Sequence, residues 1–555
     1  TTIIERMSFL INDQKANPEK ILALTFSNKA ADHLKVELVK KIGDKGSLIN
    51  ASTFHSFAQR VNLEYYRELG YKHPPRMADN SEIYFLIKEK FNTLDNLYSK
   101  EYRRDPAEAI ISLNKIFNQF QEELFNEDMI NQKLIEVDNK LLDIQDQKEI
   151  DIFLQLKDAL NIFSLYMSWK VDMGVIDYGD MIYNLWSLLK YNNVILENLK
   201  GRYEHIIIDE FQDNNYALSA IIKKISEGHN SITVVGDDDQ CIYSFRGANT
   251  YNISDFITSY KEDENYLSIA LMHNYRSSQE ILNLANFVIK SIPDRVDKGI
   301  LKSDNKTCVK PLLMIGSKEQ QLIGILNQVS QMVDKGKTLK DIAVLCRTNA
   351  QCERVSKYLA LNKIPSNYSA EKLFEQSIIK DILAGFQIIN KGEYFAQSIV
   401  RVIILQGYQD IADIMINELG STPAENSAMI NKVKDVLKSQ SDVLYDWFCH
   451  FIALAENRKV KLSKLINDIV IHLSLFQKNN GSSYKDKYNS HCLNQLLHIL
   501  NNYINQNKNM QFDKMMEYVE TLWGMNSIYV DQFNIDEDID FVQIMTIHQS
   551  KGKEF

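Results

Sequence analysis

Two adjacent carboxylates, Asp209 and Glu210, follow a run of three isoleucines in the segment 204–213. An uninterrupted apolar run of this kind predicts a strand that is buried on both faces. In an open parallel sheet, ligands bind just beyond the carboxyl ends of the strands. One carboxylate there can hold Mg²⁺, and its neighbour can orient a water for attack on a phosphate. The alternative interpretation is a solvated acidic turn after a core strand.

A second apolar strand, expected at 232–236, leads into three aspartates, Gln240 and a turn that carries Tyr243, Phe245 and Arg246. Gln240 can report a terminal phosphate through a hydrogen bond, and the two aromatic rings offer flat faces on which bases can stack. The alternatives are a surface amide and ordinary core aromatics.

An arginine, Arg276, lies in the segment 273–277. A guanidinium that points into a gap between two lobes can neutralise the charge that develops on a transferring phosphoryl group. A structural ion pair is the alternative interpretation of this residue.

Seven segments in order along the chain resemble motifs of superfamily 1 helicases of the UvrD/Rep/PcrA type. They are LTFSNKAA (24–31), STFHSF (52–57), DEFQDNN (209–215), VGDDDQCIYSFRGA (235–248), NYRS (274–277), DIAVLCRTNAQ (341–351) and MTIHQSKGKEF (545–555). The resemblance implies an α/β protein with two RecA-like parallel-sheet motor lobes, each carrying a mainly helical insertion. We expect the first lobe at 1–77 and 199–272 with its insertion at 78–198, and the second lobe at 273–368 and 541–555 with its insertion at 369–540. The candidate strands of the second lobe are the apolar segments 311–315 and 342–345.

The resemblance also assigns residue roles at a nucleotide site for ATP and Mg²⁺. It implies that Asp209 holds the metal, Glu210 acts as general base, Gln240 senses the γ-phosphate, Arg276 is an arginine finger, Tyr275 stacks on adenine and Glu554 lies near the nucleotide. Core packing is the alternative for Tyr275.

A second group of residues is implied to contact single-stranded DNA. Threonine and asparagine can bond phosphate or sugar without reading sequence, but they also cap helices and end strands. The group comprises Thr25, Phe26, Asn28, Thr53, Phe54, His55, Tyr243, Phe245, Arg246, Arg347 and His548. His548 has the further alternative of a hydrogen-bonded core histidine.

The phosphate-cradling pattern GxxxxGK[ST] occurs nowhere in the 555 residues. The last segment also stops inside its motif. We therefore expect a piece of a longer protein, incomplete at both ends, that lacks ATPase activity by itself.

Composition is that of a large globular protein, with 45% hydrophobic and 25% charged residues. A net charge of −10 argues against DNA binding through the bulk charge of the surface but permits a narrow channel lined by aromatic residues, amides and a few basic groups. The six cysteines form no CxxC pattern, which argues against a zinc site.

No apolar run of bilayer length and no signal peptide is evident, so we expect a cytoplasmic protein without a membrane partner.

The sequence thus predicts the motor of an ATP-dependent, 3′-to-5′ DNA translocase and helicase that acts in repair or replication. Its expected partners are single-stranded DNA, single-strand/duplex junctions and repair or replication proteins, with the chain a monomer or weak dimer. The alternatives are a non-hydrolysing DNA-binding remnant and the helicase portion of a recombination helicase–nuclease.

Overall fold

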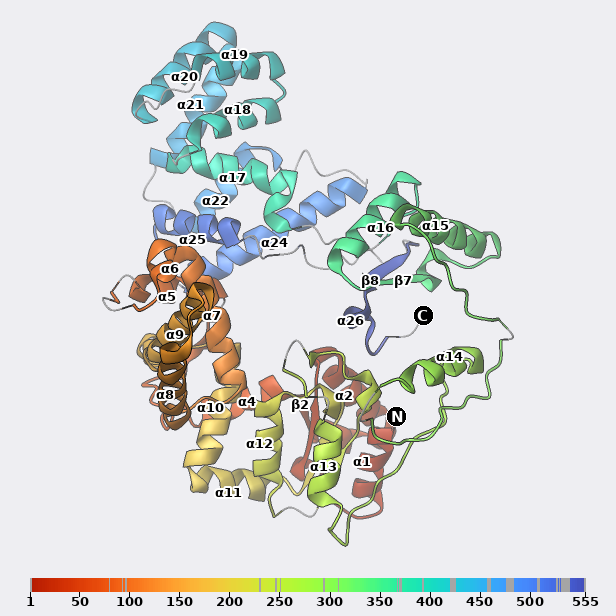
Figure 1. Cartoon of the computed structure of the whole chain (residues 1–555). Coiled ribbons are helices and arrows are strands. Elements are labelled where there is room, and N and C mark those ends of the chain that lie inside the picture. Colours follow the sequence, from red (N-terminus) through yellow and green to blue (C-terminus); the bar gives the residue numbers. More distant parts are fainter. Residues whose placement is uncertain are drawn as a thin grey trace. The chain divides into compact units, whose positions relative to one another are not determined.

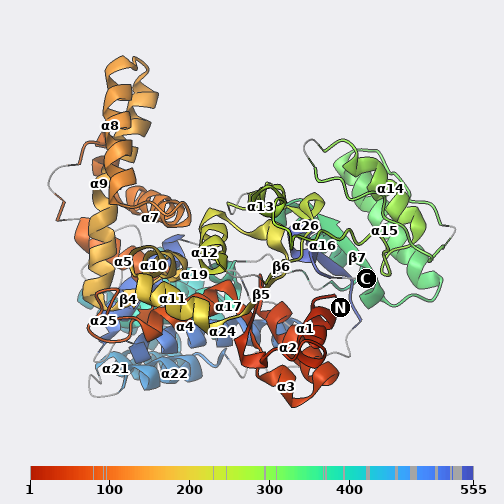
Figure 2. The ribbon, with the colours of Figure 1, turned by 90° about the horizontal axis from the view of Figure 1, so that it is seen from below.

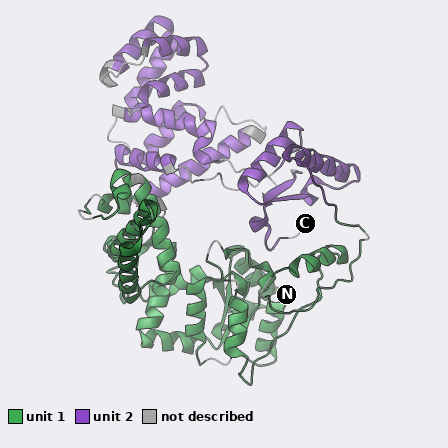
Figure 3. Cartoon of the chain, in the orientation of Figure 1, with its two compact units in different colours: residues 1–312 green, residues 313–555 purple. Residues whose placement is uncertain are grey.

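Figure 1 shows the fold of the chain as a computed structural model. The structure describes residues 2–78, 80–91, 93–94, 97–228, 231–244, 247–249, 251–292, 295–307, 309–366, 368, 372–391, 394–419, 426–456, 461–475, 484–506, 510–525, 528, 530 and 540–553. The chain forms two compact units, residues 1–312 and 313–555 (Figure 3). The lobe and insertion boundaries expected from the sequence remain predictions.

Unit 1 is built on a parallel sheet with the strand order β2-β1-β5-β6. Its strands are β1 (Ile21–Thr25), β2 (Asn50–Thr53), β5 (His205–Ile208) and β6 (Ile232–Val234). The two strands predicted to carry acids at their ends, at the isoleucine run and at 232–236, are confirmed as β5 and β6. They pair directly, with Ile206 opposite Ile232 and Ile208 opposite Val234.

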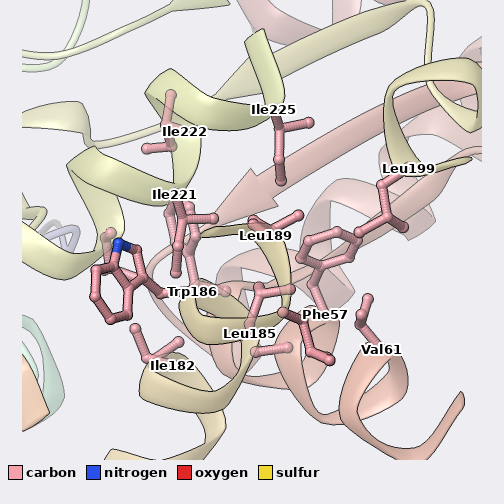
Figure 4. Packing of buried hydrophobic residues seen from close by; sticks show 14 of the residues in the cluster. Phe57, Val61, Ile182, Leu185, Trp186, Leu189, Leu199, Ile221, Ile222 and Ile225 are labelled. Carbon is pink, nitrogen blue, oxygen red and sulfur yellow. The ribbon is translucent and has the colours of Figure 1, made fainter. Parts of the chain in front are cut away.

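Both faces of this sheet are buried, as the isoleucine run predicts. Ile207 packs with α1 (Thr2–Asn12) and α2 (Asn28–Ile42), near the short helix α3 (Asp44–Ser47). Ile206 and Ile208 point to the opposite core. That core is formed with α4 (Phe54–Glu64), α10 (Tyr178–Tyr191), α11 (Asn193–Arg202), α12 (Tyr216–Ser226) and α13 (Asn252–Tyr260), and its side chains converge in Figure 4.

Between β2 and β5 the chain is mainly helical, as expected. The helices that precede α10 are α5 (Asn80–Phe91), α6 (Lys100–Arg104), α7 (Pro106–Glu122), α8 (Glu127–Asp143) and α9 (Gln147–Met173). Helices α8 and α9 run side by side (Figure 2). A small parallel pair, β3 (Arg76–Met77) with β4 (Val175–Ile176), was not expected from the sequence, because two-residue strands leave no period to detect.

A cluster of buried charges joins α9 to α10. Lys170 Nζ lies 2.8 Å from Asp177 Oδ2 and 2.7 Å from Asp180 Oδ1. Asp177 caps α10, and Asp180 completes a capping box with it. Burial raises the pKa of Asp180 to about 7. Burial acts on Asp177 too, but the charge and hydrogen bonds of Lys170 outweigh it and leave the pKa of Asp177 lowered.

Unit 2 contains a parallel strand pair, β7 (Ala343–Cys346) with β8 (Gln543–Thr546), packed against α15 (Lys318–Asp334) and α16 (Asn349–Leu361). The described residues between 377 and 525 are mainly helical, as expected for 369–540. Its helices are α17 (Ser377–Asn390), α18 (Phe395–Leu405), α19 (Gln409–Leu419), α20 (Asn426–Gln440), α21 (Asp442–Glu456), α22 (Leu462–His472), α24 (Tyr484–Gln506) and α25 (Phe512–Met525). The short α26 (Ile547–Ser550) follows β8.

One expected strand of the second lobe is absent. The apolar segment 311–315 was predicted as a strand, but it forms no ladder with any described residue. Leu313 and Ile315 are 82% and 90% exposed. An apolar run favours a strand only where a neighbour supplies hydrogen bonds, and Pro311 contributes no amide donor. Among the described helices, none is both long and apolar enough to cross a bilayer.

The buried cluster predicts a specific pH dependence of stability. An unfolded aspartate has a pKa of about 4, whereas Asp180 in the fold has a pKa of about 7. The folded state therefore binds this proton more tightly than the unfolded state does. The stabilisation from the bound proton is complete below about pH 4 and is lost as the pH rises toward about 7. Asp177 does not change this window, because its lowered pKa confines its own effect to lower pH.

We expect the melting temperature of the wild type, relative to Asp180→Asn, to fall by a few degrees between about pH 5 and about pH 8. Thermal melts followed by circular dichroism measure this difference. Asp172→Asn, at an exposed site of α9, is the control and should run parallel to the wild type. The prediction would be contradicted if the melting temperatures of the wild type and of Asp180→Asn changed in parallel over this pH range.

Candidate functional site

The carboxyl ends of four neighbouring strands meet at one edge of the unit 1 sheet. The register places Thr25 opposite Thr53, and Leu24 opposite Ile208. Because all four strands are parallel, the residues that follow them leave the sheet on the same side. The structure thereby gathers predicted residues from four distant segments, at 25–28, 53–55, 209–210 and 237–243.

Asp209 and Glu210 occupy the tip of β5. The carboxylate of Asp209 has one partner among the described residues, the Glu210 amide at 3.0 Å. Burial raises the pKa of Asp209, and repulsion from Glu210 adds to the shift. Glu210 has a φ of 51°, a left-handed conformation that is uncommon for a side chain of this kind. A turn of this kind often marks a functional position, because strain there must be maintained by its surroundings.

Gln212 was not singled out by the sequence analysis, although it lies inside the DEFQDNN segment. Its side chain is buried, and its Nε2 donates to Glu210 Oε2 at 2.6 Å. Its Oε1 accepts from the Asp237 amide at 2.9 Å. One amide therefore links the two acidic strand ends. The signal in the sequence that could have identified Gln212 was its place as a polar residue two positions after Glu210.

The three aspartates after β6 face basic residues from the segment after α14 (Gln279–Ile289). Lys298 contacts Asp237, Asp238 and Asp239, and Arg295 binds Asp239 through two bonds of 3.0 and 2.8 Å. The three carboxylates lie close enough to share a cation, and the Lys298 ammonium already fills that role. Neither basic residue was identified from the sequence, because nothing local marks a partner about 60 residues away.

Gln240 is tied to the same cluster. Its Nε2 donates to Asp237 Oδ2 at 2.7 Å, while Asp237 Oδ1 contacts Lys298. The Gln240 side chain is exposed at the start of the turn that carries Tyr243. The amide predicted to sense a phosphate is thus held by a carboxylate whose other oxygen is neutralised by Lys298.

The segment with Tyr275 and Arg276 is a tight polar turn. Asn274 Oδ1 accepts from the amides of Arg276 at 3.0 Å and Ser277 at 2.7 Å. The turn leaves Arg276 exposed and Tyr275 88% exposed, with the Tyr275 ring 4.5 Å from that of His273. Core packing, the alternative for Tyr275, is therefore excluded.

The predicted DNA contacts of unit 1 divide into exposed groups and groups that hold the turns. Phe26 and Tyr243 stack on each other, with ring centroids 5.4 Å apart and an angle of 17°. Thr53 is buried and caps α4, and its Oγ1 accepts from the Ser56 amide. Thr25 is also buried, and Phe54 joins the core, whereas Asn28 is exposed. The capping alternative therefore holds for the Thr53 hydroxyl.

His55 has an aromatic neighbour that the sequence analysis missed. Its ring meets Tyr178 edge to face, with centroids 5.9 Å apart. Tyr178 is the first residue of α10 and is 69% exposed. An exposed tyrosine that follows a helix cap is a weak signal in sequence, and only the packing of α10 on α4 brings it to His55.

Unit 2 repeats the arrangement on a smaller scale. Cys346 pairs with Thr546 at the ends of β7 and β8, so Arg347 and His548 follow neighbouring parallel strands. Arg347 is exposed, and His548 is half-buried in the first turn of α26. Three predicted site residues, Phe245, Arg246 and Glu554, lie outside the described residues.

The charge at the tip of β5 is suited to a nucleotide that carries Mg²⁺. Asp209 is a carboxylate at a strand end, and among the described residues no cation compensates it. Hard oxygen ligands of this kind suit Mg²⁺. Asp209 would hold the ion, and Glu210 would lie beside it.

Comparison with known proteins agrees with this geometry. The family model described as UvrD/REP helicase N-terminal domain matches residues 1–261, and that of the UvrD-like helicase C-terminal domain matches residues 269–555. A probable DNA helicase II homolog of Mycoplasma capricolum is 27% identical over all of this chain and 73% of its own length. The ATP-dependent DNA helicase Rep of Buchnera aphidicola is 27% identical over all of this chain and 83% of its own length. The helicase PcrA of Staphylococcus aureus is 27% identical over 70% of this chain and 50% of its own length.

The bridge made by Gln212 leads to a prediction about Gly236. A Cβ at Gly236 would lie 2.6 Å from Gln212 Oε1 and 3.3 Å from the Phe211 amide nitrogen. Gly236→Ala should displace the Gln212 amide and cost about 1–3 kcal/mol locally, because a buried Gln212 would lose its hydrogen bond from the Asp237 amide. Hydrogen exchange of the peptide that spans 232–241 should become faster. Gly201→Ala in α11, where a Cβ meets nothing within 4 Å, should leave that peptide unchanged; equal effects of the two would contradict the bridge.

Proposed function

The chain belongs to the UvrD/Rep family of DNA helicases, and we propose that it is the motor region of a 3′-to-5′ single-stranded DNA translocase and helicase that serves DNA repair or replication. The observation that carries the proposal is the shared edge of β1, β2, β5 and β6. The residues that follow these strands include the carboxylate pair after β5, the Gln240 amide after β6, and the stacked rings of Phe26 and Tyr243. The direction of movement rests on the resemblance of the motifs alone.

The acidic end of this edge handles the nucleotide. Bound Mg²⁺ supplies positive charge to the phosphates, and Asp209 is the residue that would hold it. Glu210 accepts the proton of the attacking water, and its carboxylate is oriented by Gln212 Nε2. Gln240 and Arg276 contribute hydrogen bonds and positive charge to the terminal phosphate, and Tyr275 offers its exposed ring to the base.

The aromatic groups form the path for the DNA strand. The Phe26–Tyr243 stack adjoins the β1 end, and His55 with Tyr178 adjoins the β2 end. Flat rings bind bases without regard to sequence, which suits a motor that must move along any strand. Asn28 lies exposed at the start of α2 and can bond the sugar-phosphate backbone. Arg347 and His548 provide the corresponding contacts from the strand ends of unit 2.

Substitution of the newly identified aromatic residue tests the DNA path. Tyr178→Ala should weaken binding of an oligothymidylate of about 16 nucleotides by roughly fivefold or more, since one stacked base contributes about 1–3 kcal/mol. Fluorescence anisotropy at fixed salt measures the dissociation constant. Tyr191→Ala, which removes an equally exposed tyrosine at the other end of α10, should bind like the wild type. An unchanged affinity in Tyr178→Ala would remove this residue from the path.

A second test concerns hydrolysis. Because the 555 residues contain no GxxxxGK[ST] pattern to hold the phosphates, we expect no ATP turnover by this chain with or without single-stranded DNA. A coupled phosphate-release assay measures it, with Asp209→Ala and Glu210→Gln as blanks. Turnover by the wild type that both substitutions abolish would show that the chain hydrolyses ATP without that loop.

A further inference from the structure

Lys170 is an almost fully buried lysine outside every helicase motif. Its side chain is 1% exposed, and its ammonium lies 3.9 Å from the centroid of the Tyr166 ring. It donates to Asp177 at 2.8 Å and to Asp180 at 2.7 Å. Burial of a charge is costly unless it is paired and hydrogen-bonded, so a lysine placed here requires both acids.

The two acids are in turn held by neutral donors. The Tyr166 hydroxyl donates to Asp177 Oδ2 at 2.6 Å, and Gln121 Nε2 donates to Asp180 Oδ1 at 2.8 Å. The donors come from α9 and α7, whereas the acids begin α10. With both acids ionised, the formal charges sum to −1, and the ammonium lies between the two acids. Loss of Lys170 alone would leave two adjacent buried acids without a cation.

This cluster holds the backbone on both sides of Tyr178. Before Tyr178 the Asp177 amide donates to Asp180 at 2.9 Å, and after it the Asp180 amide donates to Asp177 at 2.7 Å. Gly179 lies close to Gln121, so that a Cβ there would come within 2.2 Å of Gln121 Oε1. The two acids of the cluster therefore fix the backbone that carries Tyr178.

The ring of Tyr178 is exposed and meets His55 edge to face. The helix that carries the ring is also locked to α4, because Asn62 Nδ2 donates to the Met181 carbonyl at 2.9 Å and Leu185 packs in the same core as Phe57. The same turn of α10 thus has a buried ionic side and an exposed aromatic side.

We propose that Lys170 is a positioning residue for DNA binding: through Asp177 and Asp180 it holds the first turn of α10 so that the Tyr178 ring stands beside His55 in the strand path. The inference rests on the proposed function, which places Tyr178 in that path. In this proposal the buried charge of Lys170 does not touch the DNA but determines how well the Tyr178 ring can stack.

A double-mutant cycle tests the inference with the 555-residue chain and an oligothymidylate of about 16 nucleotides. Lys170→Met should weaken binding about fivefold or more, similar to Tyr178→Ala. In the Tyr178→Ala background, Lys170→Met should cost no further affinity, because the ring it positions is gone. Lys148→Met, at an exposed site of α9, is the matched control and should bind like the wild type.

A charge-matched variant separates positioning from damage to the fold. Lys170→Met combined with Asp180→Asn restores the formal charge of −1, so it should recover most of the affinity lost in Lys170→Met. Should Lys170→Met fail to fold, as judged by circular dichroism, Tyr166→Phe replaces it in the cycle. That change keeps the ring and removes only the hydroxyl bond to Asp177.

The outcomes are distinct. Additive losses in the cycle, or no loss in Lys170→Met or Tyr166→Phe while Tyr178→Ala binds weakly, would overturn the positioning role and leave the proposed DNA path intact. An unchanged affinity in Tyr178→Ala would instead overturn the DNA path at this residue, and the inference with it. Coupled losses with charge-matched recovery would support both.

Discussion

The candidate site depends on the parallel register of four strands. With Thr25 opposite Thr53 and Ile208 opposite Val234, the residues after each strand leave the sheet at one edge. Backbone hydrogen bonds and two buried faces fix this register, because a slip of one residue would turn every buried isoleucine of β5 to the wrong core. Side chains from segments more than 180 residues apart in the chain thereby share a surface that no local interaction could create.

Short polar bridges then set the orientation of the groups at this edge. Gln212 spans Glu210 and the Asp237 amide, and Asp237 in turn holds Gln240 and meets Lys298. A buried amide with both ends occupied allows little freedom, since an unpaired end would carry a desolvation cost. The general base and the phosphate sensor of the proposed mechanism are therefore not independent.

In each unit, two parallel strands are followed by a hydroxyl that caps the next helix. Ser27 and Thr53 do this in unit 1, and Thr348 and Thr546 do it in unit 2. The cap satisfies an amide at the helix start and fixes the direction in which the next side chains emerge. In the proposed DNA path, Thr53 would act by orienting His55, because its own hydroxyl is occupied by the α4 amide of Ser56.

The sequence alone determined the family, the buried strands with acids at their ends and the helical character of both insertions. These features could be predicted because the spacing of apolar residues and the residues of each motif are local properties of the chain. It could not show that Tyr178 meets His55, that Gln212 joins two motifs or that Lys298 neutralises the aspartates after β6, since each contact joins segments brought together only by packing. It also predicted a strand at 311–315 that does not form, because a strand needs a hydrogen-bonded neighbour as well as an apolar pattern. Periodicity specifies which faces are buried, and tertiary structure decides which partners those faces and their edges acquire.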